Sequence, residues 1–377
     1  MHRRGALGAV AMVVLAACAQ DHTVTGLAAD RAPSLTSPTT AGSDAPGAVY
    51  ALTNQASGNA VAMYARAADG SLSWIGAVPT GGTGTGASLG SQGALALSDD
   101  GRWLFAVNAG SNDVSALRVT PSGLSLASRV ASGGIGPSSV TVHGNLLYVL
   151  NAGGAGNISG FSIGGDGALT PLSGSTRALS GAGVGPAQVS FSPNGDWLVV
   201  TEKATNRIDL YAVDGDGVAG ARSTSPAAGG TPFGFAFGHR SDLFVSEAAG
   251  SASSYLIGGD GTLTVASGAV STYQGAPCWA AVTKNGKFGY TANAHSGSIS
   301  GFAIADDGTI ALIDAGGRTA DVGAGNVDLA ISGNGRYLYQ LNGNRSITGF
   351  RIESDGHLTV VGTSASLPTS TIGLVAQ

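Results

Sequence analysis

A unit that recurs seven times between Val49 and the C-terminus restricts the possible folds more than any other feature of this sequence. Each unit contains an apolar run, a short polar turn and an alternating segment that ends in a large apolar residue. These end residues are spaced 44 to 53 positions apart and are Tyr64, Leu117, Phe161, Tyr211, Tyr255, Phe302 and Phe350. Such a period accommodates four strands with their turns, which is one blade of a β-propeller. The sequence therefore predicts an all-β, seven-bladed β-propeller with four antiparallel strands in each blade.

Each end residue is followed, five and six positions later, by a turn signal. Six of the seven units carry Asp-Gly there, and the second unit carries Ser122-Gly123. Asp-Gly between two strands predicts a tight hairpin in which both turn residues adopt positive φ. Upstream of most units lies a further apolar strand that also ends in Asn-Gly or Asp-Gly, as in Ala94 to Gly101.

The two ends of the repeat region complement each other. The first unit lacks an upstream inner strand, whereas the C-terminus carries an extra apolar segment, Thr371 to Ala376. We expect this segment to pair with Val49 to Leu52 and to complete the first blade. Closing the ring in this way removes sheet edges that would otherwise be exposed.

The N-terminus has the features of an export signal. His2, Arg3 and Arg4 precede an apolar stretch that is too short to span a bilayer. The stretch ends in Leu15-Ala16-Ala17-Cys18, which resembles the lipobox of bacterial lipoproteins and implies lipidation of Cys18; an ordinary secretory signal is the alternative. We expect a signal peptide at 1–17, a tether rich in Ser, Thr, Pro and Ala at 18–46, and the propeller at 47–377. The protein would then be an exported cell-envelope lipoprotein, at the outer membrane, in the periplasm or on the cell surface, with a lipid anchor as its membrane contact.

The composition narrows the function classes. With 62 Gly and only 11% charged residues, the chain favours short strands and tight turns over surface helices. It has 18 basic and 23 acidic residues and no basic patch, so nucleic acid is not an expected partner. None of the six His residues shows the paired spacing of a zinc site, so we expect no metal. We also expect that the protein has no cofactor and is a monomer. If Cys18 is lipidated, Cys278 has no partner for an internal disulfide.

One polar residue per blade lies where the second strand ends. In chain order these residues are Asn54, Asn108, Asn151, Glu202, Glu247, Asn293 and Asn342. The turns after the second strands share one rim of a propeller with the loops that lead into the inner strands. Two glutamates on adjacent blades could face one pocket, shift each other's pKa and supply a general base. Asn is also a common turn residue, because its side chain bonds to nearby backbone, so a structural role stays open.

Further candidates lie near the same rim. Trp279 would provide a flat apolar wall for a ligand, or would pack in the core. His295 would titrate at the rim, or would be a solvated turn residue. Gly86-Ala87-Ser88-Leu89-Gly90 matches a nucleophile pattern but lacks the strand-turn-helix context that gives this pattern meaning, so we expect only a loop.

Residues 192–211 resemble the repeat of the lactonase-type seven-bladed propellers, the family of 6-phosphogluconolactonases and carboxymuconate cyclases. The resemblance rests on Ser192-Pro193-Asn194-Gly195, on Val199-Val200-Thr201-Glu202 and on Asn206 to Tyr211. Tyr148-Val149-Leu150-Asn151 is also similar to the Y-V-T-N repeats of bacterial surface proteins. The resemblance implies the propeller fold and lactone chemistry, with Glu202 as the family's catalytic glutamate.

The family's cationic positions do not match. Its His falls on Ser138, its Arg-His pair on Ala187 and Gln188, and a later Arg on Ala294. The groups that would steady a developing oxyanion are therefore missing.

Two functions follow from this partial match. The first is the opening of a small lactone or cyclic ester, or the reverse cyclisation, with Glu202 as base and Glu247 and His295 assisting. Its substrate-binding residues would be Asn108, Asn151, Gln188, Trp279, Asn293 and Asn342. The second is a non-catalytic, envelope-anchored propeller that binds a ligand or a protein partner for adhesion or scaffolding. Convergence of Glu202, Glu247 and Trp279 on one concave pocket would favour the enzyme, whereas burial of these side chains would favour the binding protein.

Overall fold

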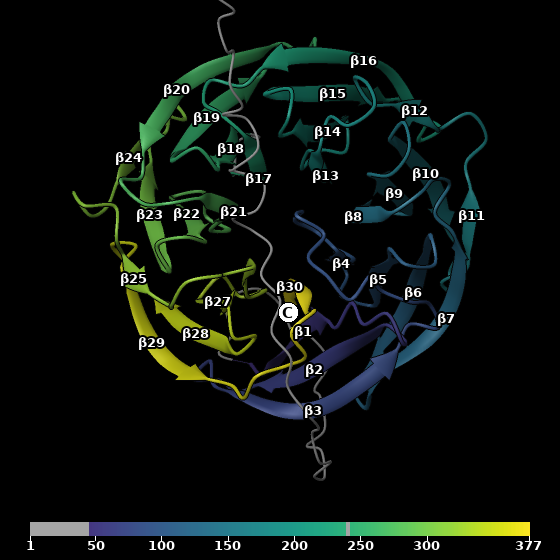
Figure 1. The fold of residues 1–377 in the computed structure, drawn as a ribbon, viewed down its shortest axis with the longest axis horizontal. Helices are drawn as coiled ribbons and strands as arrows, with labels where there is room; N and C mark the ends of the chain where they lie inside the picture. The colour runs from purple at the N-terminus through teal and green to yellow at the C-terminus, as the bar shows by residue number, and fades with distance from the viewer. Residues whose placement is uncertain (1–44, 239–241) are drawn as a thin grey trace, which may run out of the picture.

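Seven antiparallel sheets surround a central axis in the computed structural model, which describes residues 45–238 and 242–377 (Figure 1). These residues form strands and turns without a helix, so nothing in the described ranges is a helix long and apolar enough to cross a membrane. The expected signal peptide, Cys18 and nearly all of the tether lie outside the described residues. The predicted fold class, an all-β propeller of seven blades, is confirmed.

The strands of each blade, from the channel outward, are as follows. Blade 1 contains β30 (Ile372–Ala376), β1 (Gly47–Leu52), β2 (Ala60–Arg66) and β3 (Leu72–Pro79). Blade 2 contains β4 (Leu95–Leu97), β5 (Trp103–Asn108), β6 (Asp113–Thr120) and β7 (Gly123–Ala131). Blade 3 contains β8 (Pro137–His143), β9 (Leu146–Asn151), β10 (Asn157–Ile163) and β11 (Leu169–Pro171), with β12 (Arg177–Ala178) also on β10. Blade 4 contains β13 (Pro186–Phe191), β14 (Trp197–Glu202), β15 (Arg207–Val213) and β16 (Ala219–Pro226).

The remaining blades follow the same order. Blade 5 contains β17 (Pro232–Phe237), β18 (Asp242–Glu247), β19 (Ser251–Ile257) and β20 (Leu263–Ser271). Blade 6 contains β21 (Pro277–Val282), β22 (Phe288–Asn293), β23 (Ser298–Ile304) and β24 (Ile310–Leu312), with β25 (Ala320–Asp321) also on β23. Blade 7 contains β26 (Asp328–Ile331), β27 (Tyr337–Leu341), β28 (Ile347–Ile352) and β29 (Leu358–Thr363).

The first and last strands meet in blade 1, as predicted. Strand β30 pairs antiparallel with β1, so that Val49 lies opposite Ala376 and Leu52 lies opposite Ile372. Blades 7 and 1 are also joined further out, where the hydroxyl of Tyr339 donates to the carbonyl of Gly70 at 2.8 Å. The β1–β30 pairing and the Tyr339 bond to Gly70 therefore close the ring.

The Asp-Gly turns differ in one respect from the expectation. Only their glycines have positive φ, between +80° and +87°, and no aspartate of these turns does. In the first unit the N–H of Gly70 donates to the carbonyl of Ala67 at 3.0 Å, and Asp69 Oδ1 accepts from the N–H of Ser71 at 2.9 Å. This is a turn closed between its first and fourth residues, of which the fourth is the left-handed glycine, rather than a two-residue hairpin. The prediction of positive φ at both positions was wrong, because the aspartate contributes its side-chain acceptor and the glycine alone contributes the left-handed conformation.

These glycines also join neighbouring blades. A Cβ on Gly261 of blade 5 would lie 2.5 Å from the ring of Trp197 in blade 4. A Cβ on Gly356 of blade 7 would lie 2.6 Å from the ring of Phe288 in blade 6. In five of the six Asp-Gly turns, the side chain at the start of a second strand packs where the next blade's glycine has no side chain. In these blades the repeat signature is also an inter-blade contact.

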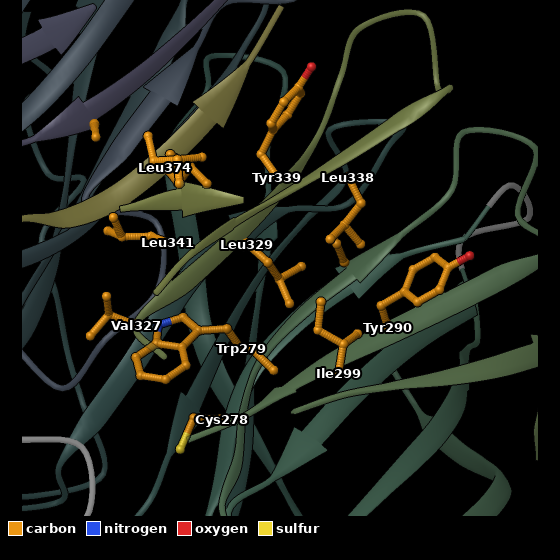
Figure 2. Close-up of a cluster of buried hydrophobic side chains, with 14 of the residues drawn as sticks. Cys278, Trp279, Tyr290, Ile299, Val327, Leu329, Leu338, Tyr339, Leu341 and Leu374 are labelled. Carbon is orange, nitrogen blue, oxygen red and sulfur yellow. The ribbon is translucent and has the colours of Figure 1, made fainter. Parts of the chain in front are cut away.

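The apolar core extends across blade boundaries. Figure 2 shows Trp279 of β21 beside Val327 and near Leu329 and Leu341 of blade 7, in a cluster that also contains Leu374 of β30. Trp279 is only 1% exposed, so its ring contributes to this inter-blade core.

Candidate functional site

The predicted ring of polar residues exists, but its side chains are buried. All seven lie at or just after the end of a second strand, and their exposed fractions are 0% except for 5% at Asn342. Most of their partners belong to the same blade. Asn293 Nδ2 donates to the hydroxyls of Ser298 and Ser300 at 3.0 and 2.8 Å, and the Nδ2 of Asn108, Asn151 and Asn342 makes comparable contacts. These side chains brace the turn between the second and third strands.

Glu247 braces blade 5 in the same way. Its carboxylate accepts from the N–H of Gly229 at 2.7 Å and from the hydroxyls of Ser251 and Ser253 at 2.5 and 2.6 Å. Gly229 belongs to the loop that leads into β17, and the carboxylate fills the space where a Cβ on this glycine would lie. Glu247 therefore anchors this loop to its blade.

Glu202 anchors the corresponding loop of blade 4. Oε1 accepts from the N–H of Ser180 at 2.9 Å, and Oε2 accepts from the hydroxyls of Ser180 and Thr205. Glu202 and Glu247 are adjacent around the ring, yet their hydrogen-bond partners come from different loops. The expected pairing of these two glutamates is not what the structure shows.

Glu202 instead forms a carboxyl pair with Asp209 of its own blade. In blade 2 the hydroxyl of Ser115 contacts Asn108, and in blade 6 the hydroxyl of Ser300 contacts Asn293. In blade 4 the fully buried Asp209 takes the corresponding position beside Glu202. Burial, together with the charge of Glu202, raises the pKa of Asp209 to about 7. Burial opposes the ionisation of Glu202, but the hydrogen bonds that it accepts outweigh burial and lower its pKa. Below about pH 7 Asp209 therefore carries a proton, while Glu202 stays ionised down to acidic pH.

The other predicted site residues are spread over the rim. Gln188 of β13 bonds through both atoms of its amide to the backbone of Phe235 in blade 5, at 2.8 and 3.0 Å. His295 is exposed in the turn after β22. The structure thus places the predicted residues on one rim, but most of them bond within their own blade or to its entry loop rather than to one another.

The channel mouth, meaning the end of the central channel at this rim, is occupied by the chain itself. Residues 86–93, called the channel loop below, lead into β4 and extend toward the middle of the ring (Figure 1). The indole N–H of Trp279 donates to the carbonyl of Ser91 at 3.0 Å, and the ammonium of Lys203 donates to the carbonyl of Gly90. The same ammonium lies 4.8 Å from the centre of the Phe233 ring. The loop with the serine-nucleophile pattern is therefore a structural part of the channel mouth.

Gln92 holds the channel loop across the channel. Its amide accepts from the N–H of Ala280 at 2.9 Å and donates to the carbonyl of the same residue at 2.7 Å. Gln92 thus contacts Ala280 of blade 6 through both atoms of its amide, as Gln188 contacts Phe235 of blade 5. The amide of Gln92 occupies the space where a side chain on Gly234 would lie, so Gln92 replaces a contact that Gly234 cannot make.

Lys203 is the functional candidate that the sequence analysis missed. It is 9% exposed, and its ammonium brings a positive charge to the channel mouth. The residues that align with the family's cationic positions, Ser138, Ala187, Gln188 and Ala294, carry no charge. The sequence offered one signal, since Lys203 directly follows Glu202 in a chain with only two further lysines, Lys284 and Lys287. Lys203 is the first residue after β14, and its ammonium bonds to the channel loop, whereas the Glu202 carboxylate bonds to Ser180 and Thr205.

Two hollows elsewhere on the surface do not involve the predicted site. One is lined by Asn194, Trp197 and Gly258 between blades 4 and 5, and the other by Trp74 and Leu367 between blades 1 and 7. Within the described residues, no group of three or more His, Cys, Asp or Glu side chains could hold a metal ion.

Solved structures show the same fold. The periplasmic gluconolactonase of Pseudomonas aeruginosa is 20% identical, with a TM-score of 0.68 and coverage of 87% of this chain and 98% of that chain. A protein from Lactobacillus plantarum is 18% identical, with a TM-score of 0.71 and coverage of 88% and 99%. A Bacteroides uniformis protein, proposed to be a 6-phosphogluconolactonase, is 20% identical, with a TM-score of 0.69 and coverage of 87% and 99%. At these identities the likeness shows the fold alone.

Sequence comparison adds the family. No curated protein matches the chain. The family described as "Lactonase, 7-bladed beta-propeller" matches residues 49–180 and 235–316, which is more than half of the chain. The unmatched stretch between these segments contains blade 4 with Glu202, Lys203 and Asp209. The repeat, the ring closure and this match together show that the chain belongs to the lactonase family of seven-bladed β-propellers.

Proposed function

We propose that this lactonase-family propeller acts as a non-catalytic binding protein of the cell envelope. The observation that carries the proposal is the burial of both candidate catalytic glutamates. Glu202 and Glu247 are 0% exposed, and loop and turn groups of the protein itself take up their oxygens. A general base must reach the water that it activates, and neither carboxylate is open to the channel mouth.

The channel mouth supports the same proposal. In an active hydrolase this region would be open for the substrate, whereas here the channel loop fills it with five contacts. These are the contacts of Gly90 with Lys203, of Ser91 with Ser138 and Trp279, and of Gln92 with Ala187 and Ala280. The ligand or protein partner, the envelope location and the lipid anchor on Cys18 are all parts of this proposal.

Lactone hydrolysis is the second candidate, and one observation favours it. The hydroxyl of the exposed Thr205 donates to Glu202 Oε2 at 2.7 Å, so a proton could pass from a rim water through this hydroxyl to the carboxyl pair. A carboxyl pair with one proton near neutral pH is typical of catalytic sites. The P. aeruginosa relative is named as a gluconolactonase, which makes glucono-δ-lactone the first substrate to test.

Lactonase assays with the full-length chain separate the two candidates. Ring opening of glucono-δ-lactone and of a panel of simple lactones is followed for the wild type, Glu202→Gln and Glu247→Gln. The binding proposal expects no ring opening above the buffer rate in any of the three proteins. Ring opening by the wild type that Glu202→Gln abolishes, while the circular dichroism spectrum stays unchanged, would establish the hydrolase instead.

A further inference from the structure

We propose that the channel mouth binds a small carboxylate and that residues 90–92 of the chain occupy this site as an internal ligand. The inference rests on the binding function proposed above. It adds the class of ligand and the movement that would admit the ligand.

Two donors from different blades converge on the channel loop. The ammonium of Lys203 in blade 4 and the indole N–H of Trp279 in blade 6 bind the carbonyl oxygens of two consecutive loop residues. The Phe233 ring lies between them, with its centre 4.8 Å from the ammonium and 5.2 Å from the centre of the Trp279 ring. A cation and an N–H group above an aromatic surface form a donor set for two oxygens.

A carboxylate suits this donor set better than the loop does. It presents two oxygens from one group, and it carries a charge that neutral carbonyls lack. The bond of Lys203 to a loop carbonyl is charged on the donor only, whereas a carboxylate adds the attraction between two opposite charges. A free carboxylate should therefore compete with the loop carbonyls for Lys203.

The channel loop can leave the site without breaking a pair of strands, although the bond of the Gln92 N–H to the Ala187 carbonyl of β13 must open. Gly86, Gly90 and Gly93 have φ of +75°, +58° and +81°, a region in which glycine rotates freely and other residues are strained. Strand β4 begins only at Leu95, after the last of these glycines. The glycines thus provide hinges on both sides of Ser91 and Gln92.

The side chain of Gln92 contributes two of the hydrogen bonds that hold the loop in the closed position. Its two bonds to Ala280 are neutral, and a partly exposed amide can exchange such bonds for bonds to water. Truncation of Gln92 to Ala removes these two bonds and leaves the space beside Gly234 of β17 unfilled, without altering Lys203, Phe233 or Trp279. Gln92→Ala should therefore release the loop and leave the donors of the site intact.

Calorimetric titration with sodium gluconate tests the proposal on the full-length protein. Gln92→Ala should bind gluconate about tenfold or more tightly than the wild type, because two neutral hydrogen bonds no longer favour the closed loop. Adding Lys203→Met, which removes the ammonium but retains the stem over Phe233, should abolish this gain. Uncharged glucose should not bind measurably to any variant.

Gln274→Ala is the matched control. Gln274 also bonds through its amide on the same rim, to Gly316 and Ser298, but it touches no residue of the channel mouth in these contacts. This variant should bind gluconate like the wild type. Hydrogen exchange adds a direct measurement, since amides of residues 88–93 should exchange faster in Gln92→Ala and in the presence of gluconate.

Several results would overturn the inference. Equal gluconate affinity of the wild type and Gln92→Ala would show that the loop does not compete with the ligand. Absence of gluconate binding to folded Gln92→Ala, or binding that survives Lys203→Met, would remove the site itself. These results are independent of lactone hydrolysis, so they can be distinguished from a failure of the proposed function.

Discussion

Replacement of Asp209 by Asn should make the protein more stable at alkaline pH. In the folded protein the pKa of Asp209 rises from its ordinary value of 3.8 to about 7, because the carboxyl is buried beside Glu202. The unfolded chain releases this proton near pH 4, so between about pH 4 and 7 the folded state holds a proton that the unfolded state has lost. Stability must then fall as the pH rises through this window.

The size of the effect follows from the same values. A pKa that rises from 3.8 to about 7 corresponds to at most about 4 kcal/mol of unfolding free energy lost across the window. The value of about 7 already includes the charge of Arg222, which favours the ionised form and whose Nε lies 3.6 Å from Asp209 Oδ2. The lowered pKa of Glu202 has the opposite sign, but it acts below that residue's ordinary value of 4.5. The fall should therefore appear above that pH.

Asn at position 209 keeps the shape of the side chain, can donate to Glu202, and does not titrate. Urea unfolding gives the free energy of unfolding of the wild type and of Asp209→Asn at about pH 5 and about pH 8. The difference between the two proteins is compared at the two pH values, so that the titration of all other groups cancels. The advantage of the variant should grow by a few kcal/mol from the lower to the higher pH. Asp216→Asn, in an exposed turn of the same blade, should show no such growth. A pH dependence of Asp209→Asn that parallels the wild type would refute the proton-sharing pair.

Three further predictions concern the fold and the anchor. Deletion of residues 371–377 should abolish cooperative thermal unfolding, because it removes β30 from blade 1; a shortened protein that melts like the parent would refute the closure. Gly261→Ala should destabilise the protein by about 1–3 kcal/mol in urea unfolding, because the new Cβ meets the Trp197 ring at positive φ, whereas Gly259→Ala in the same turn meets nothing and should be neutral. Cys18→Ser should prevent incorporation of labelled fatty acid and release the protein from the membrane fraction, and unchanged labelling would contradict lipidation of this cysteine.

The fold was predictable because each blade repeats the same local signals. Alternating apolar residues, the regular period and the turn glycines all favour one structure, and the additional strand at Thr371 to Ala376 indicated how the ring closes. The conformation of the Asp-Gly turns was not predictable from the dipeptide alone. The outcome depends on the residue two positions before Asp, whose carbonyl closes the turn.

The site was less predictable, since position in a strand does not determine what a side chain contacts. The positions of Glu202 and Glu247 at the ends of second strands were correct, but their partners come from the loops at Ser180 and Gly229. Sequence spacing does not show which loop folds over which carboxylate. The contact of Gln92 with Ala280 joins residues 188 positions apart, and it depends on the missing side chain at Gly234. Such cross-channel contacts become visible only in three dimensions.

The direction of β1 also determines how the protein would be presented by an anchor. Gly47 lies at one end of β1, and the carbonyl of Asn54, just beyond the other end, accepts from the N–H of Gly86 in the channel loop. The chain that precedes the propeller therefore joins it at the face opposite the channel mouth. A propeller held through its N-terminus would turn Lys203 and Trp279 away from the attachment surface, so that solutes and macromolecules arriving from the far side would meet this rim first.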